Sequence, residues 1–152
     1  MAEGSLERTL VLIKPDGVKR GLVGEILTRL ERKGLKILAM KTVAITPEAA
    51  ARHYAEHEGK PFYPSLMQHI TSGPVVAIAF EGRSAIAVVR LLTGTTNPQT
   101  ADPGTVRGDY ALGITANLVH ASDSPESAAR ELPLYFAPEE LLGYSRAGEE
   151  YY

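Results

Sequence analysis

The sequence predicts a mixed α/β (α+β) domain in which helices cover a single β-sheet. Apolar runs of strand length alternate along the chain with segments of helical periodicity, and capping residues and prolines mark helix starts between them. No repeat, linker or low-complexity segment divides the chain. Its 152 residues therefore suit one domain, residues 1–152, that can bury a core without disulfides or structural metal.

The first half of the chain begins with a β-rich apolar run at residues 9–13. The next segment predicts a helix, because its apolar residues recur at helical spacing: Val23, Ile26, Leu27 and Leu30. Gly34 is expected to end this helix. Residues 35–45 predict a second strand. An N-cap, a first-turn proline and an acidic residue at positions 46–48 then start a helix that runs to about Glu56.

The second half of the chain opens with a weaker helix, predicted at residues 61–70. After a turn, the continuous apolar run at residues 75–80 is typical of a central strand buried on both faces. Ser84 is expected to cap the next helix, which turns Ile86 and Val89 inward. A loop then extends over residues 94–109, and loops of that length are usually functional.

One histidine lies where an apolar strand meets a strongly marked helix start. Residues 118–119 predict a short buried strand, and residues 124–126 supply an N-cap serine, a first-turn proline and an acidic residue. The helix is expected to run to about Leu132, before Pro133. Its amide groups and positive dipole end would lie close to His120, where a phosphate could be held.

His120 has the chemistry of a phosphate carrier. An unperturbed histidine is mostly neutral at pH 7, so one ring nitrogen keeps a lone pair for attack without an activating base. Glu131 lies in the following helix, where it could accept a hydrogen bond from the other ring nitrogen and stabilise the positive charge of attack. A lone histidine is more often structural, so the assignment depends on the rest of the chain.

Residues 117–124 resemble the Asn-x-x-His-x-Ser-Asp-Ser motif of the nucleoside diphosphate kinases. Further motifs similar to that family follow in family order, at residues 8–18, 53–54, 60–62, 72–76, 94–98 and 103–109. The resemblance spans about residues 7–144. Several separated motifs in preserved order are far harder to obtain by chance than one short pattern.

The resemblance implies a ferredoxin-like βαββαβ core with an antiparallel four-stranded sheet, plus the long loop and a C-terminal extension. It also implies an enzyme, a nucleoside-diphosphate kinase that works by a reversible ping-pong mechanism. A nucleoside triphosphate, with ATP as the expected donor, gives its terminal phosphoryl group to His120, and a nucleoside diphosphate collects it. One site serves both half-reactions, because phosphohistidine keeps a high transfer potential.

Phosphate binding must be distributed over several elements, because the chain has no Walker loop and no dinucleotide glycine pattern. Phosphoryl transfer requires charge neutralisation and alignment, so cations from separate elements must converge. Lys14, Arg90 and Arg107 are the candidates. By resemblance, Arg90, Thr96 and Arg107 contact phosphates.

The resemblance assigns the remaining site residues as well. Lys14 and Asn117 reach the sugar hydroxyls and the transferred group, and Tyr54 and Ser122 support His120. Phe62 corresponds to the aromatic residue that stacks on the base, which implies broad base specificity; simple core packing is its alternative. Mg²⁺ is expected to travel with the nucleotide phosphates, since no carboxylate cluster forms a metal cage, and no metal site fixed by protein side chains is predicted.

Two other functions compete with this interpretation. Residues 53–57 match the H-x-x-E-H pattern of zinc metallopeptidases, in which both histidines share a helix face and Glu56 is the base, although no third ligand is evident. A non-catalytic nucleotide-binding relative is the second alternative. Ala121 stands where the family usually has glycine, and Ala116 where an arginine often precedes the asparagine. His69 is predicted to be structural or on the surface.

The amino-acid composition limits the kinds of partner and the location that we expect for this protein. Sixteen basic and 18 acidic side chains give a net charge of -2, so no global attraction to nucleic acid or acidic lipid is expected. Cysteine is absent, residues 1–7 carry no apolar targeting segment, and no stretch is apolar enough to span a bilayer, so we expect a cytoplasmic protein. The resemblance implies a homo-oligomer, commonly a hexamer and sometimes a tetramer, with the long loop contributing to contacts between subunits. Residues 143–152 are expected either to pack on a neighbour or to be mobile.

Overall fold

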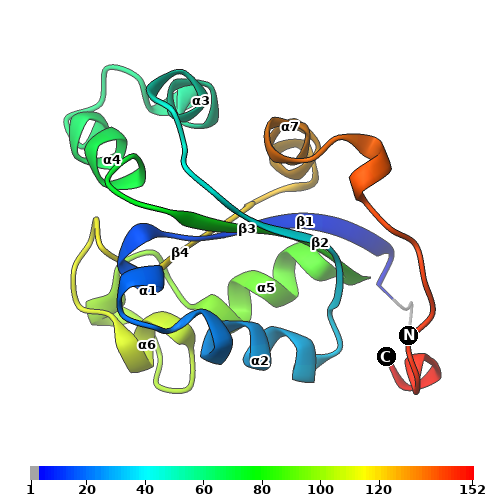
Figure 1. The fold of residues 1–152 in the computed structure, drawn as a ribbon. Helices are drawn as coiled ribbons and strands as arrows, with labels where there is room; N and C mark the ends of the chain where they lie inside the picture. The colour runs from blue at the N-terminus through cyan, green and yellow to red at the C-terminus, as the bar shows by residue number, and fades with distance from the viewer. Residues whose placement is uncertain (1–3) are drawn as a thin grey trace.

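A computed structural model describes residues 4–152; residues 1–3, part of the segment predicted to lack a targeting signal, lie outside the described residues. A four-stranded antiparallel sheet in the order β2-β3-β1-β4 forms the centre of the molecule (Figure 1), which confirms the predicted sheet. Its strands are β1 (Leu6–Ile13), β2 (Lys36–Val43), β3 (Val75–Arg83) and β4 (Val119–Ala121).

Helices cover both faces of this sheet, as Figure 1 shows. One face carries α2 (Val23–Lys33), α5 (Ala85–Thr93) and α6 (Val106–Tyr110), and the other carries α3 (Pro47–His53), α4 (Tyr63–Ile70) and α7 (Pro125–Tyr135). The short helix α1 (Pro15–Lys19) follows β1 directly. The order β1-α2-β2-β3-α5-β4 gives the expected βαββαβ core, with α3 and α4 inserted between β2 and β3.

Strand β1 explains why the apolar runs are continuous rather than alternating. Val11 and Ile13 face the core under α2 and α5, whereas Leu10 and Leu12 face the core under α3, α4 and α7. All of these side chains are fully buried. A strand with helices on both sides has no polar face, and burying each such side chain contributes about 1.5–3 kcal/mol.

Helix α3 is shorter than predicted. It ends at His53, and a 3₁₀ turn, η1 (Ala55–His57), follows in place of the helix expected to reach Glu56. The Tyr54 side chain is buried in the core, and the chain tightens after it through the His57 N–H bond to the Tyr54 carbonyl at 2.9 Å. His53 and His57 therefore do not share an α-helical face, contrary to the zinc-peptidase pattern.

Helix α7 is longer than predicted, because it continues through Pro133 to Tyr135. Pro133 lies in the last turn and removes the N–H that would bond the Ala129 carbonyl; Ala129 is exposed, so water can satisfy that carbonyl instead. Leu132 and Phe136 on either side are buried in the core, and the Phe136 N–H bonds the Leu132 carbonyl at 3.0 Å. Tertiary packing thus outweighs the local preference of the residue before a proline.

Some helix starts are set by neighbouring residues and others by residues distant in the sequence. Thr46 and Ser124 cap α3 and α7 as predicted, each accepting a backbone N–H from three residues on. Ser84 does not cap α5: its φ is 50° and its side chain makes no cap bond. Glu7 replaces it, since its carboxylate accepts the Ile86 N–H at 3.3 Å. The predicted long loop contains α6 and a 3₁₀ turn, η2 (Pro98–Thr100).

The C-terminal tail packs on its own chain, against the sheet edge and the end of α2. Lys36 on β2 forms an ion pair with Glu149 at 2.7 Å, within the 3₁₀ turn η4 (Glu149–Tyr151). Arg146 donates to the carbonyls of Gly34 and Leu35 at 2.7 and 3.1 Å. These contacts hold the tail in place, so it is not mobile, whereas its packing on a neighbouring subunit stays a prediction. A further 3₁₀ turn, η3 (Pro138–Glu140), precedes the tail. No described helix is both long and apolar enough to cross a membrane.

Candidate active site

A pocket of about 390 Å³ opens beside the edge strand β4. Its wall combines side chains from β4, from the segments after β1 and α3, from α5 and from the loop before β4. Most of the residues predicted to form the site line this pocket: Lys14, Tyr54, Phe62, Arg90, Thr96, Arg107, Asn117 and His120. The fold thus brings together side chains that are distant in the sequence, such as Lys14 and Asn117, which lie 103 positions apart.

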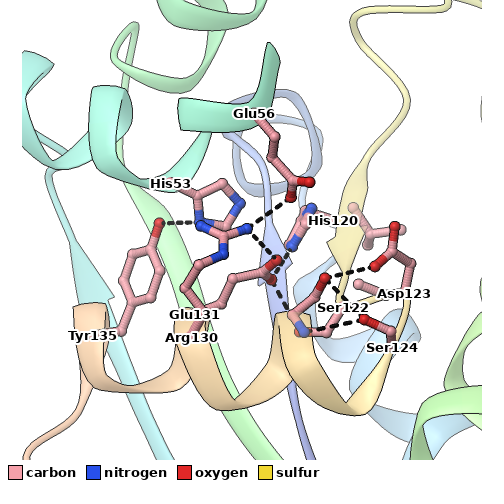
Figure 2. Close-up of polar contacts among 12 residues, drawn as sticks. His53, Glu56, His120, Ser122, Asp123, Ser124, Arg130, Glu131 and Tyr135 are labelled. Atoms are coloured by element: carbon pink, nitrogen blue, oxygen red, sulfur yellow. Dashed lines mark hydrogen bonds and ion pairs between the residues drawn. The ribbon is translucent and has the colours of Figure 1, made fainter. Parts of the chain in front are cut away.

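Glu131 and Ser122 lie behind His120 and orient its ring. The Glu131 carboxylate, 4% exposed, accepts a hydrogen bond from His120 Nε2 at 2.6 Å (Figure 2). Ser122 Oγ donates to the same carboxylate oxygen at 2.9 Å. An ionised carboxylate only accepts hydrogen bonds, so Nε2 carries the proton and Nδ1 keeps the lone pair. The His120 side chain is 20% exposed, and the residue lines the pocket.

Three cations meet around the pocket. Burial, together with the charge of Arg107, lowers the pKa of Lys14 to about 8. Burial, together with the charge of Arg90, lowers the pKa of Arg107 to about 10. Among the residues described as lining the pocket, the one carboxylate is Asp123. Clustered cations that lack matching carboxylates predict an anionic ligand.

Hydrogen bonds hold these cations in place. Lys14 Nζ donates to Asn117 Oδ1 at 2.8 Å, and the Asn117 amide donates to the Thr96 carbonyl at 3.0 Å. Arg107 donates to three carbonyls, those of Gly94, Asn117 and Val119, at 2.8, 3.2 and 2.7 Å. Arg90 donates to the Ala121 carbonyl at 3.2 Å. The cations are therefore fixed before any ligand arrives, which reduces the entropy cost of binding.

The backbone before His120 makes a strained turn. Leu118, predicted to begin the strand, has a φ of 75°, and β4 begins one residue later. The Val119 N–H bonds the Asn117 carbonyl at 2.9 Å, so residues 117–119 form a γ-turn. Ala121, by contrast, has no positive φ. Its replacement of the family's usual glycine therefore causes no backbone strain.

Phe62 is 47% exposed and lines the pocket, so it is not a core-packing residue. His57 contacts it edge to face, with ring centroids 5.4 Å apart. Tyr54 is 5% exposed and also lines the pocket, and its ring contacts that of His53 edge to face with centroids 4.8 Å apart. The pocket lining thus includes both an exposed aromatic ring and the oriented imidazole.

His53 and Tyr135 lie behind His120, although nothing in the sequence indicated them as its neighbours. The rings of His53 and His120 pack edge to face, with centroids 4.4 Å apart and planes at 77°, and the Tyr135 hydroxyl hydrogen-bonds His53 Nδ1 at 2.9 Å. Burial, with the charges of His120 and Arg130, lowers the pKa of His53 to about 2, so its ring is neutral. Tyr135 is 82 residues from His53, so no sequence spacing could indicate the pair.

A metal ion has one candidate set of ligands in the described part of the chain. His53, His120 and Glu131 offer atoms within 4.8 Å of one another. Two of the ring nitrogens already have partners, because His53 Nδ1 bonds the Tyr135 hydroxyl at 2.9 Å and His120 Nε2 bonds Glu131 at 2.6 Å. His57 is not part of this set, and Glu56 pairs with Arg130 at 2.8 Å. The zinc site of the H-x-x-E-H pattern is therefore not assembled.

The start of α7 differs from its expected role as an anion site. Its Ser127 N–H donates to Ser124 Oγ at 3.0 Å, and Ser127 Oγ donates to Asp123 at 2.7 Å. The pocket lining includes Asp123 but not residues 125–128. Positive charge at the pocket therefore comes from the three cationic side chains rather than from this helix end.

Comparison with known proteins adds an independent finding. The family model described as nucleoside diphosphate kinase matches residues 7–141. A nucleoside diphosphate kinase of Archaeoglobus fulgidus is 58% identical, over 96% of this chain and 97% of its own length. One of Pyrococcus abyssi is 54% identical, over 100% of this chain and 98% of its own length.

Solved structures are similar along the same span. A halophilic nucleoside diphosphate kinase from Halobacterium salinarum, in complex with CDP, matches with a TM-score of 0.94 and 48% identity, covering 97% of this chain and 98% of its own. A transition state mimic of the enzyme from Borrelia burgdorferi, with bound vanadate and ADP, matches with a TM-score of 0.90 and 37% identity, covering 95% of each chain.

Proposed function

Because this chain belongs to the nucleoside diphosphate kinase family, we propose that His120 carries the transferred phosphoryl group between the two half-reactions. As a member of that family, the chain is an enzyme that transfers the terminal phosphoryl group of a nucleoside triphosphate to a nucleoside diphosphate. The observation that supports the role of His120 is the hydrogen bond from its Nε2 to buried Glu131 at 2.6 Å, which leaves Nδ1 as the nucleophile beside three fixed cations. The ten predicted site residues act in this proposal as follows.

In the first half-reaction, the Nδ1 lone pair of His120 attacks the terminal phosphorus of the triphosphate. The bond from that phosphorus to the bridging oxygen breaks, and the diphosphate leaves with the electron pair. Glu131, supported by Ser122, stabilises the positive charge that develops on the imidazole. In the second half-reaction, a terminal oxygen of another diphosphate attacks the same phosphorus, and the N–P bond returns its electrons to the ring.

The cations neutralise phosphate charge in both directions. Arg90 and Arg107 fork onto phosphate oxygens with Thr96 beside them, and Lys14 and Asn117, already joined at 2.8 Å, reach the sugar hydroxyls and the transferred group. Tyr54 supports the nucleophile through His53, whose ring contacts both Tyr54 and His120. Among the described residues the pocket offers one carboxylate, Asp123, which is too few for a protein cage, so the nucleotide phosphates would hold Mg²⁺ and the ion would neutralise part of their charge.

Base recognition rests on Phe62. Its exposed ring offers a stacking surface, and stacking tolerates every base because each has a π-face. We therefore propose broad acceptance of purine and pyrimidine nucleotides, with ATP as the donor.

The proposal extends to assembly and location. We expect one domain over residues 1–152 that assembles as a homo-oligomer, a hexamer or alternatively a tetramer. Leu112 and Ile114, 77% and 63% exposed in the segment after α6, support an interface between subunits. A cysteine-free chain suits the reducing cytoplasm, where we place the protein. The net charge of -2 argues against specific nucleic acid as a partner.

Terminally labelled ATP tests the role of His120. The parent protein is expected to acquire an acid-labile, alkali-stable label that passes to added GDP, and His120→Gly is expected to acquire none. His57→Gly is the matched control, because His57 lines the same pocket. This variant is expected to be labelled like the parent. Equal labelling of parent and His120→Gly would move the nucleophile elsewhere, and an unlabelled, folded parent would favour the non-catalytic alternative.

A further inference from the structure

The γ-turn at Leu118 needs external support. Leu118 is fully buried with a φ of 75°, a backbone conformation that a bulky residue rarely adopts. Such a conformation persists where surrounding contacts fix it. Arg107 holds one side of the turn through the carbonyls of Asn117 and Val119 at 3.2 and 2.7 Å. The other side of the turn depends on the segment that follows β1.

Two groups of that segment bind the Leu118 peptide groups. The Lys14 N–H donates to the Leu118 carbonyl at 2.8 Å, and the Leu118 N–H donates to Asp16 Oδ2 at 3.0 Å. A buried backbone N–H without an acceptor is costly. The orientation of the Asp16 carboxylate therefore determines whether the turn keeps its shape.

His69 holds that carboxylate. Its Nε2 lies 2.8 Å from Asp16 Oδ1, and the two side chains are only 19% and 13% exposed. Burial raises the pKa of Asp16, but the hydrogen bond and charge of His69 and the Leu118 N–H outweigh it and place the pKa below its usual value. Asp16 is thus an ionised acceptor fixed at both oxygens, one by α4 and one by the turn.

Edge strand β4 makes His120 sensitive to this turn. The strand has three residues and pairs on one side only, with β1, where His120 lies opposite Leu12. A short edge strand gives its side chains little independent support. The turn immediately precedes it and also carries Asn117, the partner of Lys14 Nζ.

We propose that His69 is a positioning residue for phosphoryl transfer: by holding the Asp16 carboxylate, it fixes the γ-turn at Leu118 and so orients His120 and Asn117. The contact runs from the last turn of α4 through α1 to the start of β4. The inference rests on the proposed role of His120, and it goes beyond that role because neither His69 nor Asp16 lines the catalytic pocket.

Three variants test the proposal. His69→Phe removes the donor, His69→Gln keeps an N–H that can reach Asp16, and Gln68→Ala changes the exposed neighbour on the same helix as a matched control. The rate of His120 phosphorylation by ATP in a single turnover is expected to fall about tenfold in His69→Phe, with the ADP dissociation constant within about twofold of the parent. His69→Gln is expected to restore most of the rate.

Exchange of the Leu118 amide hydrogen supplies a second readout that reports the turn directly. It is expected to accelerate in His69→Phe and to stay slow in His69→Gln and Gln68→Ala. His69→Ala, which adds no bulk, replaces His69→Phe if that variant does not fold.

The outcomes separate this inference from the function itself. Unchanged phosphorylation in the donor-deficient variant would overturn it, as would a His69→Gln variant as slow as His69→Phe. A parent protein that acquires no label on His120 would overturn the proposed function instead.

Discussion

Replacing Glu131 with glutamine measures what its charge contributes to transfer. The carboxylate is buried and accepts from both His120 Nε2 at 2.6 Å and Ser122 Oγ at 2.9 Å. Glutamine keeps the volume and an acceptor oxygen, so chiefly the charge is lost. A hydrogen bond to a charged group contributes about 1.5–3 kcal/mol against about 1 kcal/mol for a neutral one. The loss of about 0.5–2 kcal/mol corresponds to a transfer that is slower by about two- to thirtyfold.

Rapid-quench measurement of His120 phosphorylation by ATP is the assay, with nucleotide affinity followed separately. Glu131→Gln is expected to lower the phosphorylation rate and leave the dissociation constant of ADP nearly unchanged, because the charge on the ring appears only during attack. Ser122→Ala should cost less, and the double variant should be less than additive, since both contacts share one carboxylate oxygen. A Glu131→Gln enzyme as fast as the parent would refute the reasoning.

Three further predictions concern charge, stacking and packing. The pKa of Lys14 is lowered to about 8, so the free enzyme loses this positive charge as the pH rises through that value. We therefore expect kcat/KM to fall above pH 8, and we expect Lys14→Met to abolish this fall in the pH profile. Phe62→Ala should weaken the binding of every nucleotide by about 1–3 kcal/mol in titrations with purine and pyrimidine diphosphates, whereas Phe62→Tyr should keep the affinity. A loss of affinity for one base alone would contradict stacking. Leu10→Ala should destabilise the fold by about 2–5 kcal/mol in chemical denaturation, since this side chain is fully buried, while Leu91→Ala, 68% exposed, should change little.

Local patterns in the sequence predicted what depends on neighbouring residues. Thr46 and Ser124 cap helices as expected, and Gly34 ends α2 with a φ of 118°. These features arise within one helical turn, so a short window contains their whole cause. The motifs around His120, Phe62 and the cations likewise named the side chains that the structure brings to one pocket.

Long-range contacts decided the rest. Glu7 rather than Ser84 caps α5, packing of Leu132 and Phe136 carries α7 past Pro133, and burial of Tyr54 accompanies the early end of α3. The partners of the site show the same dependence, because Tyr135 reaches His53 across 82 residues. Propensity and capping act over a few residues, whereas the energy of a buried contact depends on which distant segments the sheet order brings together. The sequence alone therefore named the candidate reacting groups and two supports of His120, Glu131 and Ser122. Only the tertiary structure decided the contacts between distant segments, such as Tyr135 with His53 and His69 with Asp16.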